Sequence, residues 1–480
     1  MKTNIIRRSM LVTALLFLSL AFGGCKKFLD IDLPSDTIAG ENAFVSDASS
    51  SAVVSGIFLN MMSNTYFTSN SIGLKAGLYA DELQNLDVNA TSNEAFYKNA
   101  LNAGIVTQWE GLYRELYKCN VAIKGIKESS GLSSKNQWLG ESLVCRATLY
   151  FYLVNLFGDV PLALTPDHNV NNKLSRAPRE QVYQQMILDL KEAQSLLGTA
   201  YTDGFAQPTS TRGRPNRYAA TALLARVYLY TGDWASAEAE ATSVIEAGTS
   251  VFDLVPHASA FLANSKETIW ALSPPATGLA PDYNLYNAGA PAIVATPAAL
   301  TVKTPLSQSL INAFEPGDLR FTEWVRRATT TTPASTYYYP NKYKSAVPGA
   351  EYQILLRIGE QYLIRAEARA QRNNVAGAVQ DLNAIRARSR AAVPGALPDY
   401  AATIGQDACL AAVAKERRTE LFAEFGSRFF DLKRTAAITA VMTAEAVVKG
   451  GAEWQNEMQF WPIRVEDTRL NPNLKQTPGY

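Results

Sequence analysis

The sequence predicts a mostly α-helical protein, a single large globular domain built on tetratricopeptide-like helical hairpins with a loop-rich excursion of minor β-structure. Apolar residues recur at helical spacing in most segments after residue 40, while two-residue alternation is scarce. Two hairpin-like segments share one apolar pattern. Ten of the 22 prolines fall between Pro274 and Pro348, and proline disfavours helix.

The helical periodicity can be followed along nearly the whole chain. The predicted helices cover residues 42–62, 94–129, 134–156, 179–197, 215–231, 234–247, 306–314, 351–371, 375–390 and 407–433. Short polar or glycine-containing breaks separate most of them. The segments 215–247 and 351–390 are the two predicted hairpins.

The two hairpins repeat one pattern at a constant offset of 141 residues. Gly232-Asp233 breaks the first hairpin and Asn373-Asn374 breaks the second. The apolar faces that follow these breaks are Trp234, Ala237, Ala241 and Val244, and Val375, Ala378, Leu382 and Ile385. Small residues on such a face let two helices approach closely, as in tetratricopeptide hairpins. Because the repeats are not in tandem, we expect a globular domain that contains them and not an open solenoid.

The region of residues 265–350 has a different composition. It contains "PDYNLYNAGAP" and "STYYYPNKYKS", which are rich in proline, glycine and tyrosine. Long connections with little regular structure are usually functional or disordered. The abundant tyrosine favours an ordered, functional excursion, and we expect the ligand region here.

The N-terminus predicts export. Lys2, Arg7 and Arg8 precede the apolar run 11–22, which is shorter than the roughly 20 residues of a membrane span. Gly23 and Gly24 then lead into Cys25, so residues 1–24 form a predicted lipoprotein signal peptide with Cys25 as the acylated first residue of the mature domain, 25–480. The alternative is an ordinary cleaved signal with an incidental cysteine.

Composition argues against several classes of function. The net charge is +1 and no long basic stripe is present, so we expect no nucleic-acid partner. Only two histidines occur, which leaves little for a zinc site or a Ser-His triad, and we expect no metal or cofactor. The remaining cysteines are Cys119, Cys145 and Cys409, and buried free thiols are favoured over a disulfide between the first two.

No familiar catalytic motif is present in the chain. Asp81-Glu82 is one acidic candidate, although acids at a helix start on a solvated face are the favoured interpretation. The densest charged stretch, "AKERRTELFAEFGSRFFDLKR", spaces Arg417 from Glu420, and Arg428 from Asp431, by three residues. Glu416 and Glu420 share a helix face and repel unless arginines lie between them. We therefore expect a partly buried ion network that fixes packing and not an active site.

Aromatic and amide side chains in the loops are candidates for sugar binding. Tyrosine and phenylalanine rings offer flat apolar faces, and polar neighbours match hydroxyl groups. The candidate rings are Tyr66, Phe67, Phe96, Tyr97, Tyr283 and Tyr286, and their candidate polar partners are Asp87, Asn89, Asn284 and Asn287. For any one of these rings taken alone, ordinary packing is the favoured interpretation.

Five segments together resemble the SusD/RagB family of nutrient-binding outer-membrane lipoproteins from Bacteroidetes. These are "CKKFLDIDLP", "RPNRYAATALLARVYLYTGDWASA", "LLRIGEQYLIRAEARAQ", "ERRTELFAEFGSRFFDLKR" and "NPNLKQTPGY". The resemblance covers residues 25–480. It implies a SusD-like fold that captures ligand for a TonB-dependent transporter of the SusC type, with a lipid on Cys25 anchoring the chain to the cell surface. The family's ligand residues lie in variable loops and cannot be transferred one by one.

The resemblance predicts a non-enzymatic glycan-binding lipoprotein that delivers oligosaccharide to its transporter. The alternative within the same fold is a peptide ligand, as in the RagB branch. A third hypothesis is a protein-interaction scaffold without a small ligand, which predicts that Tyr283→Ala and Tyr286→Ala leave nutrient uptake unchanged. An enzyme is the least favoured hypothesis.

Overall fold

The computed structural model describes residues 43–63, 66–68 and 71–480. The chain divides into two compact units, residues 1–43 and 44–480, and every helix and strand described belongs to the second. The structure is about 51% helical with few strands, which confirms the mostly-α prediction. The predicted signal peptide and Cys25 lie outside the described residues.

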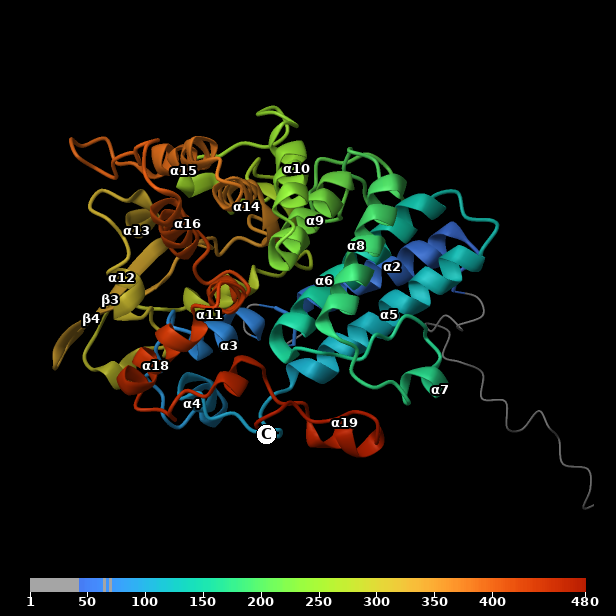
Figure 1. Cartoon of the computed structure of the whole chain (residues 1–480), viewed down its shortest axis with the longest axis horizontal. Helices are drawn as coiled ribbons and strands as arrows, with labels where there is room; N and C mark the ends of the chain where they lie inside the picture. The colour runs from blue at the N-terminus through green and yellow to red at the C-terminus, as the bar shows by residue number, and fades with distance from the viewer. Residues whose placement is uncertain (1–42, 64–65, 69–70) are drawn as a thin grey trace, which may run out of the picture. The chain divides into compact units, whose positions relative to one another are not determined.

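Consecutive helices that pack on one another form the frame of the second unit (Figure 1). In chain order along this row they are α5 (Gln108–Glu128), α6 (Lys135–Phe157), α8 (Arg179–Leu196), α9 (Arg217–Thr231), α10 (Trp234–Ile245), α14 (Ile358–Gln371), α15 (Val375–Ser389) and α16 (Gln406–Glu420). α2 (Asp47–Ser63) lies against α5 and α6. The row therefore continues from one predicted hairpin to the other, because α10 packs on α14.

α6 is the central helix of the first half. Every residue from Trp138 to Phe157 in this helix is buried, since neighbouring helices cover all its faces. Its buried charges are paired: Arg146 binds Asp189 at 2.7 Å, and Glu141 binds Arg214 at 2.5 Å. A helix that is apolar on all sides is stable only in such an interior position.

The two hairpins confirm the predicted repeat in detail. Gly232 and Asn373, which are 141 residues apart, both adopt positive φ angles, 74° and 62°. Asp233 and Asn374 follow as N-caps, and each side chain accepts a hydrogen bond of 3.1 Å from the amide three residues on. Glycine and asparagine tolerate the left-handed conformation, so both breaks reverse the chain at little strain. The predicted faces are buried through Ala237, Ala241, Val244, Ala378, Leu382 and Ile385.

Two predicted long helices are interrupted in the structure. The segment 94–129 splits into α4 (Thr91–Tyr97) and α5, and 407–433 splits into α16 and α17 (Ser427–Arg434). In the second break Ala423, Phe425 and Gly426 have positive φ angles of 56°, 45° and 77°. The amide of Ala423 donates to Glu82 Oε1 at 3.4 Å. A contact across 341 residues therefore accompanies a turn that the local helical pattern cannot indicate.

The loop-rich excursion carries the sheets. β1 (Thr268–Leu272) pairs antiparallel with β5 (Gln353–Arg357), so the predicted helix 351–371 begins as a strand and becomes α14 at Ile358. A second sheet has the order β2-β3-β4, formed by Ile293–Val294, Val325–Thr331 and Ala334–Pro340. Short helices lie between these strands: α11 (Pro281–Tyr286), α12 (Gln308–Ile311), α13 (Leu319–Trp324) and the 3₁₀ turn Pro297–Ala299; a further 3₁₀ turn, His257–Ser259, precedes β1.

The remaining helices do not belong to the main row. They are α3 (Ile72–Tyr79), α7 (His168–Asn171), α18 (Ile438–Lys449), α19 (Val465–Leu470) and a 3₁₀ turn at Asn456–Gln459. Tyr79, Phe96 and Phe429 pack around Trp461, with ring centroids 4.9 to 6.3 Å from its ring. The C-terminal segment is thus part of the main core. Among the described residues, no helix combines the length and apolar content that crossing a bilayer requires.

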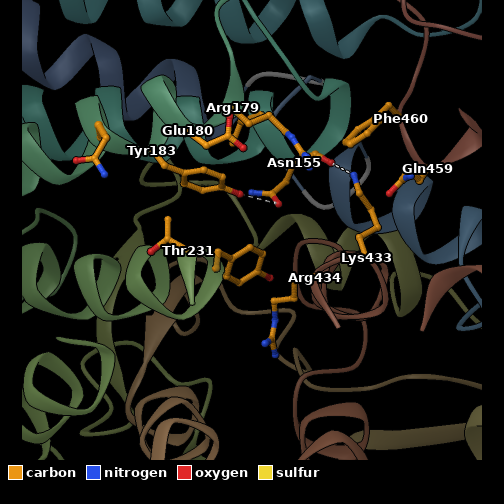
Figure 2. A pocket seen from close by; sticks show the side chains of 12 residues that line it. Asn155, Arg179, Glu180, Tyr183, Thr231, Lys433, Arg434, Gln459 and Phe460 are labelled. Atoms are coloured by element: carbon orange, nitrogen blue, oxygen red, sulfur yellow. Dashed lines mark hydrogen bonds between the residues drawn. The ribbon is translucent and has the colours of Figure 1, made fainter. Parts of the chain in front are cut away.

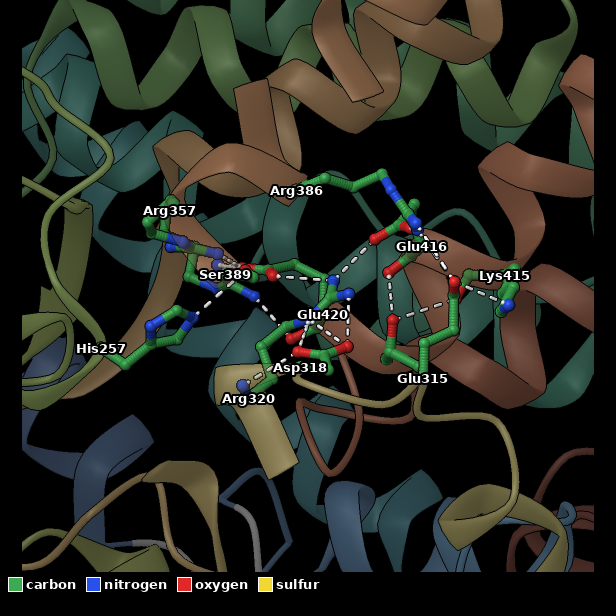
Figure 3. Close-up of polar contacts among 12 residues, drawn as sticks. His257, Glu315, Asp318, Arg320, Arg357, Arg386, Ser389, Lys415, Glu416 and Glu420 are labelled. Carbon is green, nitrogen blue, oxygen red and sulfur yellow. Dashed lines mark hydrogen bonds and ion pairs between the residues drawn. The ribbon is translucent and has the colours of Figure 1, made fainter. Parts of the chain in front are cut away.

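A buried ion network joins the excursion to α15 and α16 (Figure 3). Its centre is Glu420, which accepts contacts from Arg357 at 2.6 Å, from Arg320 at 3.4 Å and from Arg388. Its neighbour Glu416 binds Arg320 at 2.8 Å and Arg386 at 2.6 Å. Arg320 thus lies between the two carboxylates of one helix face, and the predicted packing role of this stretch is confirmed.

Arg417 and Arg428 do not pair with the acidic residues three positions further along the chain. Arg417 binds Asp431 at 2.7 Å, and Arg428 binds Asp81 at 2.8 Å. The break between α16 and α17 explains both pairs, because it turns the end of the stretch back toward α16 and toward the end of α3. Helical spacing predicts contacts only while a helix continues.

Asp81 and Glu82 are buried beyond the end of α3, so the prediction of a solvated helix start is wrong. Arg418 and Arg428 neutralise Asp81. Glu82 makes no salt bridge in the described part of the chain, and its Oε2 is buried without a hydrogen-bond partner there. Burial, and then the charge of Asp81, raise the pKa of Glu82 to about 7. The pair is sealed from solvent and serves packing.

Replacing Glu420 is expected to destabilise the fold strongly. Burial alone raises the pKa of this carboxyl, yet the charges of Arg388, Arg357 and Arg320 outweigh it and hold the pKa well below 4.5. Glu420→Gln leaves buried arginines short of one negative charge, which is expected to lower the free energy of unfolding by about 3–5 kcal/mol. Urea unfolding at pH 7 measures this change.

A surface ion pair supplies the control for that variant. Glu110→Gln removes one of the acidic partners of Arg464, and the side chains of Glu110 and Arg464 are 38% and 28% exposed. We expect a change below about 1 kcal/mol, since exposed pairs contribute little. Equal effects of the two substitutions would contradict the central role of Glu420.

Replacing Glu82 is expected to change how stability depends on pH. Its folded pKa, about 7, lies above the unfolded value of 4.5, so its stabilising contribution is present below pH 4.5 and lost as pH rises through 7. The side chain at this position in the Glu82→Gln variant stays neutral at every pH. The free energy of unfolding of this variant, minus that of the parent chain, is therefore expected to rise by about 3 kcal/mol between pH 4.5 and 8. Urea titrations across this range test it. The exposed Glu453→Gln is the control, and equal slopes in the two variants would refute the assignment.

Candidate functional site

The predicted residues of the excursion lie on and beside α11. Tyr283 is half-buried against the core and Asn284 is exposed. Asn287 donates from Nδ2 to the Tyr343 carbonyl at 2.7 Å. Tyr286 is only 2% exposed, so its ring is not a platform for a ligand: it packs inside, and its carbonyl accepts hydrogen bonds from Arg326. Tyr283 and Asn284 remain accessible.

Asp87 and Asn89 form a turn that leads into α4. Asp87 Oδ1 accepts a hydrogen bond from the Asn89 amide at 3.1 Å. Asn85 donates from Nδ2 to both the Asp87 carbonyl and Glu94, at 2.9 and 2.7 Å, which fixes the turn on the helix. Tyr97 at the end of α4 is half-buried, with Lys449 Nζ 5.4 Å from its ring centroid. Asn89 is exposed, so amide and ring are both accessible in this segment.

Tyr66 and Phe67 lie elsewhere. Tyr66 packs on Gly111 of α5, where an added Cβ would come within 2.2 Å of the tyrosine, and Arg114 lies 5.1 Å from its ring centroid. Phe67 is 1% exposed and packs between Tyr152 and Phe425 at 5.3 and 5.6 Å. Phe67 is therefore a core residue, and the prediction of a platform there is wrong.

Backbone contacts tie one of these groups to the excursion that carries another. Leu83 and Leu306 form an antiparallel bridge, and the amides of Gln84 and Leu86 donate to the carbonyls of Pro305 and Lys303, both at 2.8 Å. The segment 83–97 therefore lies against the excursion that carries α11 and the β2-β3-β4 sheet. We call the exposed part of 83–97 and 281–294 the loop surface. Val88 and Ile293 on it are 67% and 69% exposed.

The fold brings one serine and one histidine together that the sequence does not associate. His257 Nε2 lies 3.2 Å from Ser389 Oγ, although 132 residues separate them. Burial, and then Arg388, lower the pKa of His257 to about 3, and Ser389 is fully buried. A neutral histidine and a serine closed off from solvent cannot meet a substrate, so this contact is structural.

The cysteines and acids supply no reactive centre in the described residues. Cys119, Cys145 and Cys409 are free and buried, as predicted. Burial raises the pKa of the Cys119 and Cys145 thiols, which keeps them protonated. No group of three histidine, cysteine or acidic side chains within these ranges is placed to hold a metal ion.

Other cavities open elsewhere among the described residues, including the following two. The first, about 370 Å³, lies between α6, α8, α9 and α17, and Arg179 and Lys433 point into it (Figure 2). We call it the Lys433 cavity. The second, about 400 Å³, is a groove along α5 near α7 and α19, lined by Trp109, Tyr117, Asn171 and others. Neither cavity is lined by a predicted ligand residue, because each is assembled from segments far apart in sequence.

Two family profiles match the chain. One, described as "Starch-binding associating with outer membrane", matches residues 27–229, and the other, described as "SusD family", matches residues 321–480. Together they include the first hairpin helix α9 and the whole of the second hairpin.

Curated relatives are similar over part of their length. The chain is 24% identical to SusD-like protein P25 of Formosa agariphila over 274 residues, which are 53% of this chain and 50% of that protein. It is 28% identical to SusD-like protein P2 of the same organism over 229 residues, 46% and 43% of the two chains. The alignments thus span about half the length of these two relatives or less.

Solved structures share the fold over nearly their whole length. A SusD homologue from Bacteroides thetaiotaomicron superposes with a TM-score of 0.76 at 18% identity, covering 92% of this chain and 98% of that one. A laminarin-binding SusD-like protein gives 0.73 at 22%, covering 91% and 100%, and surface glycan-binding protein A of Bacteroides fluxus gives 0.72 at 21%, covering 91% and 100%. Taken with the two profile matches, these likenesses place the chain in the SusD/RagB family.

Proposed function

We propose that this chain is a cell-surface lipoprotein that captures an oligosaccharide and delivers it to a SusC-like TonB-dependent transporter of the outer membrane. The observation that carries the proposal is the loop surface, where the accessible rings of Tyr97 and Tyr283 lie in segments that also expose Asn89 and Asn284. Rings stack on the apolar faces of sugars, while amides exchange hydrogen bonds with hydroxyl groups.

The similar proteins support the choice of ligand. One matching family profile is described as starch-binding, and two structures with this fold carry names that state laminarin binding and glycan binding. The proposal extends that ligand class to the loop surface of this chain. Binding without catalysis is part of the proposal, since the Ser389–His257 pair is sealed and the paired acids serve packing.

The anchor and the transporter complete the proposal. Acylation of Cys25 tethers the chain to the outer membrane with the second unit facing the cell exterior, since several acyl chains on one residue bind a bilayer firmly. Ligand held on the loop surface then passes to the transporter beneath. A peptide ligand is the competing outcome of the binding experiment below.

The loop surface is tested by calorimetric titration of the chain starting at Lys26 with a panel of plant, host and microbial oligosaccharides. We expect binding to one glycan class, and Tyr97→Ala and Tyr283→Ala are each expected to weaken it about tenfold, because a stacked ring contributes roughly 0.5–1.5 kcal/mol beyond its area. Tyr117→Ala is the matched control, since the Tyr117 ring is 49% exposed and lies in the groove along α5, away from the loop surface. Binding to oligopeptides alone, or sensitivity only to Tyr117→Ala, would refute the site.

The anchor is tested separately in cells. Cys25→Ser removes the acylated thiol, so we expect the chain to leave the outer-membrane fraction while its binding of glycan in solution stays unchanged. Radiolabelled palmitate incorporation and fractionation measure both effects. The matched control is Cys409→Ser, a buried thiol far from the N-terminus in sequence. Membrane retention of the Cys25→Ser chain would contradict the anchor.

A further inference from the structure

The Lys433 cavity has walls from five segments of the chain. Asn155 comes from α6, Arg179 and Tyr183 from α8, Tyr230 from the end of α9, Lys433 from α17 and Phe460 from the segment that follows the last 3₁₀ turn. Figure 2 shows Arg179 and Lys433 directed toward Asn155 from different walls. Its volume of about 370 Å³ is within the range of sites for small molecules, roughly 300–1,000 Å³.

Lys433 is a basic side chain without an acidic partner in the described part of the chain. Its Nζ donates to the Asn155 carbonyl and lies 4.2 Å from the centroid of the Phe460 ring. Burial, and then the charge of Arg179, hold the pKa of its amine well below 10.5, and no carboxylate offsets them. A partly buried ammonium group flanked by a second cation is stable only when an anion is near.

The described residues around the cavity supply no carboxylate that pairs with Lys433. Arg434, which also lines it, is already neutralised by Glu367 at 2.8 Å and by Asp431 at 2.8 Å. Arg179 lies 4.0 Å from Asp159 at a pair that is about half exposed, and Glu180 is exposed at the rim. The cavity therefore presents the amine of Lys433, which pairs with no carboxylate of the described residues, and at its rim the exposed guanidinium of Arg179.

Hydrogen-bonding groups line the rest of the cavity. Tyr183 donates to Asn155 Oδ1 at 3.2 Å, while Tyr230 is half-buried and its hydroxyl makes no hydrogen bond within the described residues. The side-chain amides of Gln184 and Gln459 add donors and acceptors. A bare inorganic anion would occupy only a small part of this space, whereas a hydroxylated organic acid matches both the charge and the amides.

We propose that the Lys433 cavity binds a small hydroxylated carboxylate of the sugar-acid class, with its carboxylate between Lys433 and Arg179 and its hydroxyl groups on the amide and tyrosine side chains. This site is separate from the loop surface and takes a different ligand. It makes the chain a receptor for a charged monosaccharide in addition to the neutral oligosaccharide of the proposed function.

The site is tested by titrating the intact chain with sodium glucuronate, glucose and inorganic phosphate. We expect glucuronate to bind and glucose to give no heat. Arg179→Gln is expected to weaken glucuronate binding about tenfold without unfolding the chain, because Arg179 is exposed at the rim and its loss leaves the packing intact. Lys191→Gln, an exposed lysine on the same helix, is the matched control and should leave the affinity unchanged.

A second readout separates ligand binding from a structural effect. A bound carboxylate favours the protonated amine of Lys433, so we expect the pKa of this amine to rise on binding and protons to be taken up. The measured heat should then depend on the buffer's ionisation enthalpy, and Lys433→Met is expected to abolish that dependence. Absence of glucuronate binding by the folded chain, binding of phosphate in its place, or equal affinity in Arg179→Gln and the parent chain would each overturn the proposal.

Discussion

The charge of Glu420 holds together parts of the chain that the helical row alone does not connect. Its carboxylate lies among Arg320 of the excursion, Arg357 at the start of α14 and Arg388 of α15, all with side chains at most 5% exposed. A buried carboxylate without these arginines would be strongly disfavoured, and the arginines without it equally so. The excursion can therefore adopt only positions in which these charges meet. Because residues 281–294 belong to the excursion, the same ion pairs limit where this part of the loop surface can lie.

The row of helices is held together by the packing of buried helix faces. α6 is buried on every side by its neighbours, and the α9–α10 and α14–α15 hairpins repeat one packing arrangement at a fixed offset. Each junction needs only a residue that tolerates positive φ followed by a capping side chain. Helices built this way are rigid supports, so ligand groups on the connecting loops are held at defined positions.

The two proposed ligand surfaces depend on different physical features. On the loop surface, exposed amides and half-buried rings lie on two segments, and backbone hydrogen bonds such as that between Leu86 and Lys303 tie the first segment to the excursion. In the Lys433 cavity, a lysine without a carboxylate partner among the described residues lies within walls from several helices. Stacking on neutral sugars is therefore proposed for the loop surface, and selection by charge for the cavity.

The sequence by itself determined the helical periodicity, the two hairpins with their breaks at Gly232 and Asn373, and the packing role of the stretch around Glu420. These are local properties, because side-chain spacing and backbone preference act over a few residues. Only the tertiary structure decided which charges meet, such as Arg428 with Asp81, which rings are enclosed, such as Phe67 and Tyr286, and which distant groups line a cavity, such as Lys433. The exposure of a side chain and the identity of its ion-pair partner depend on contacts between residues far apart in sequence. A residue's type and its immediate neighbours do not predict these contacts.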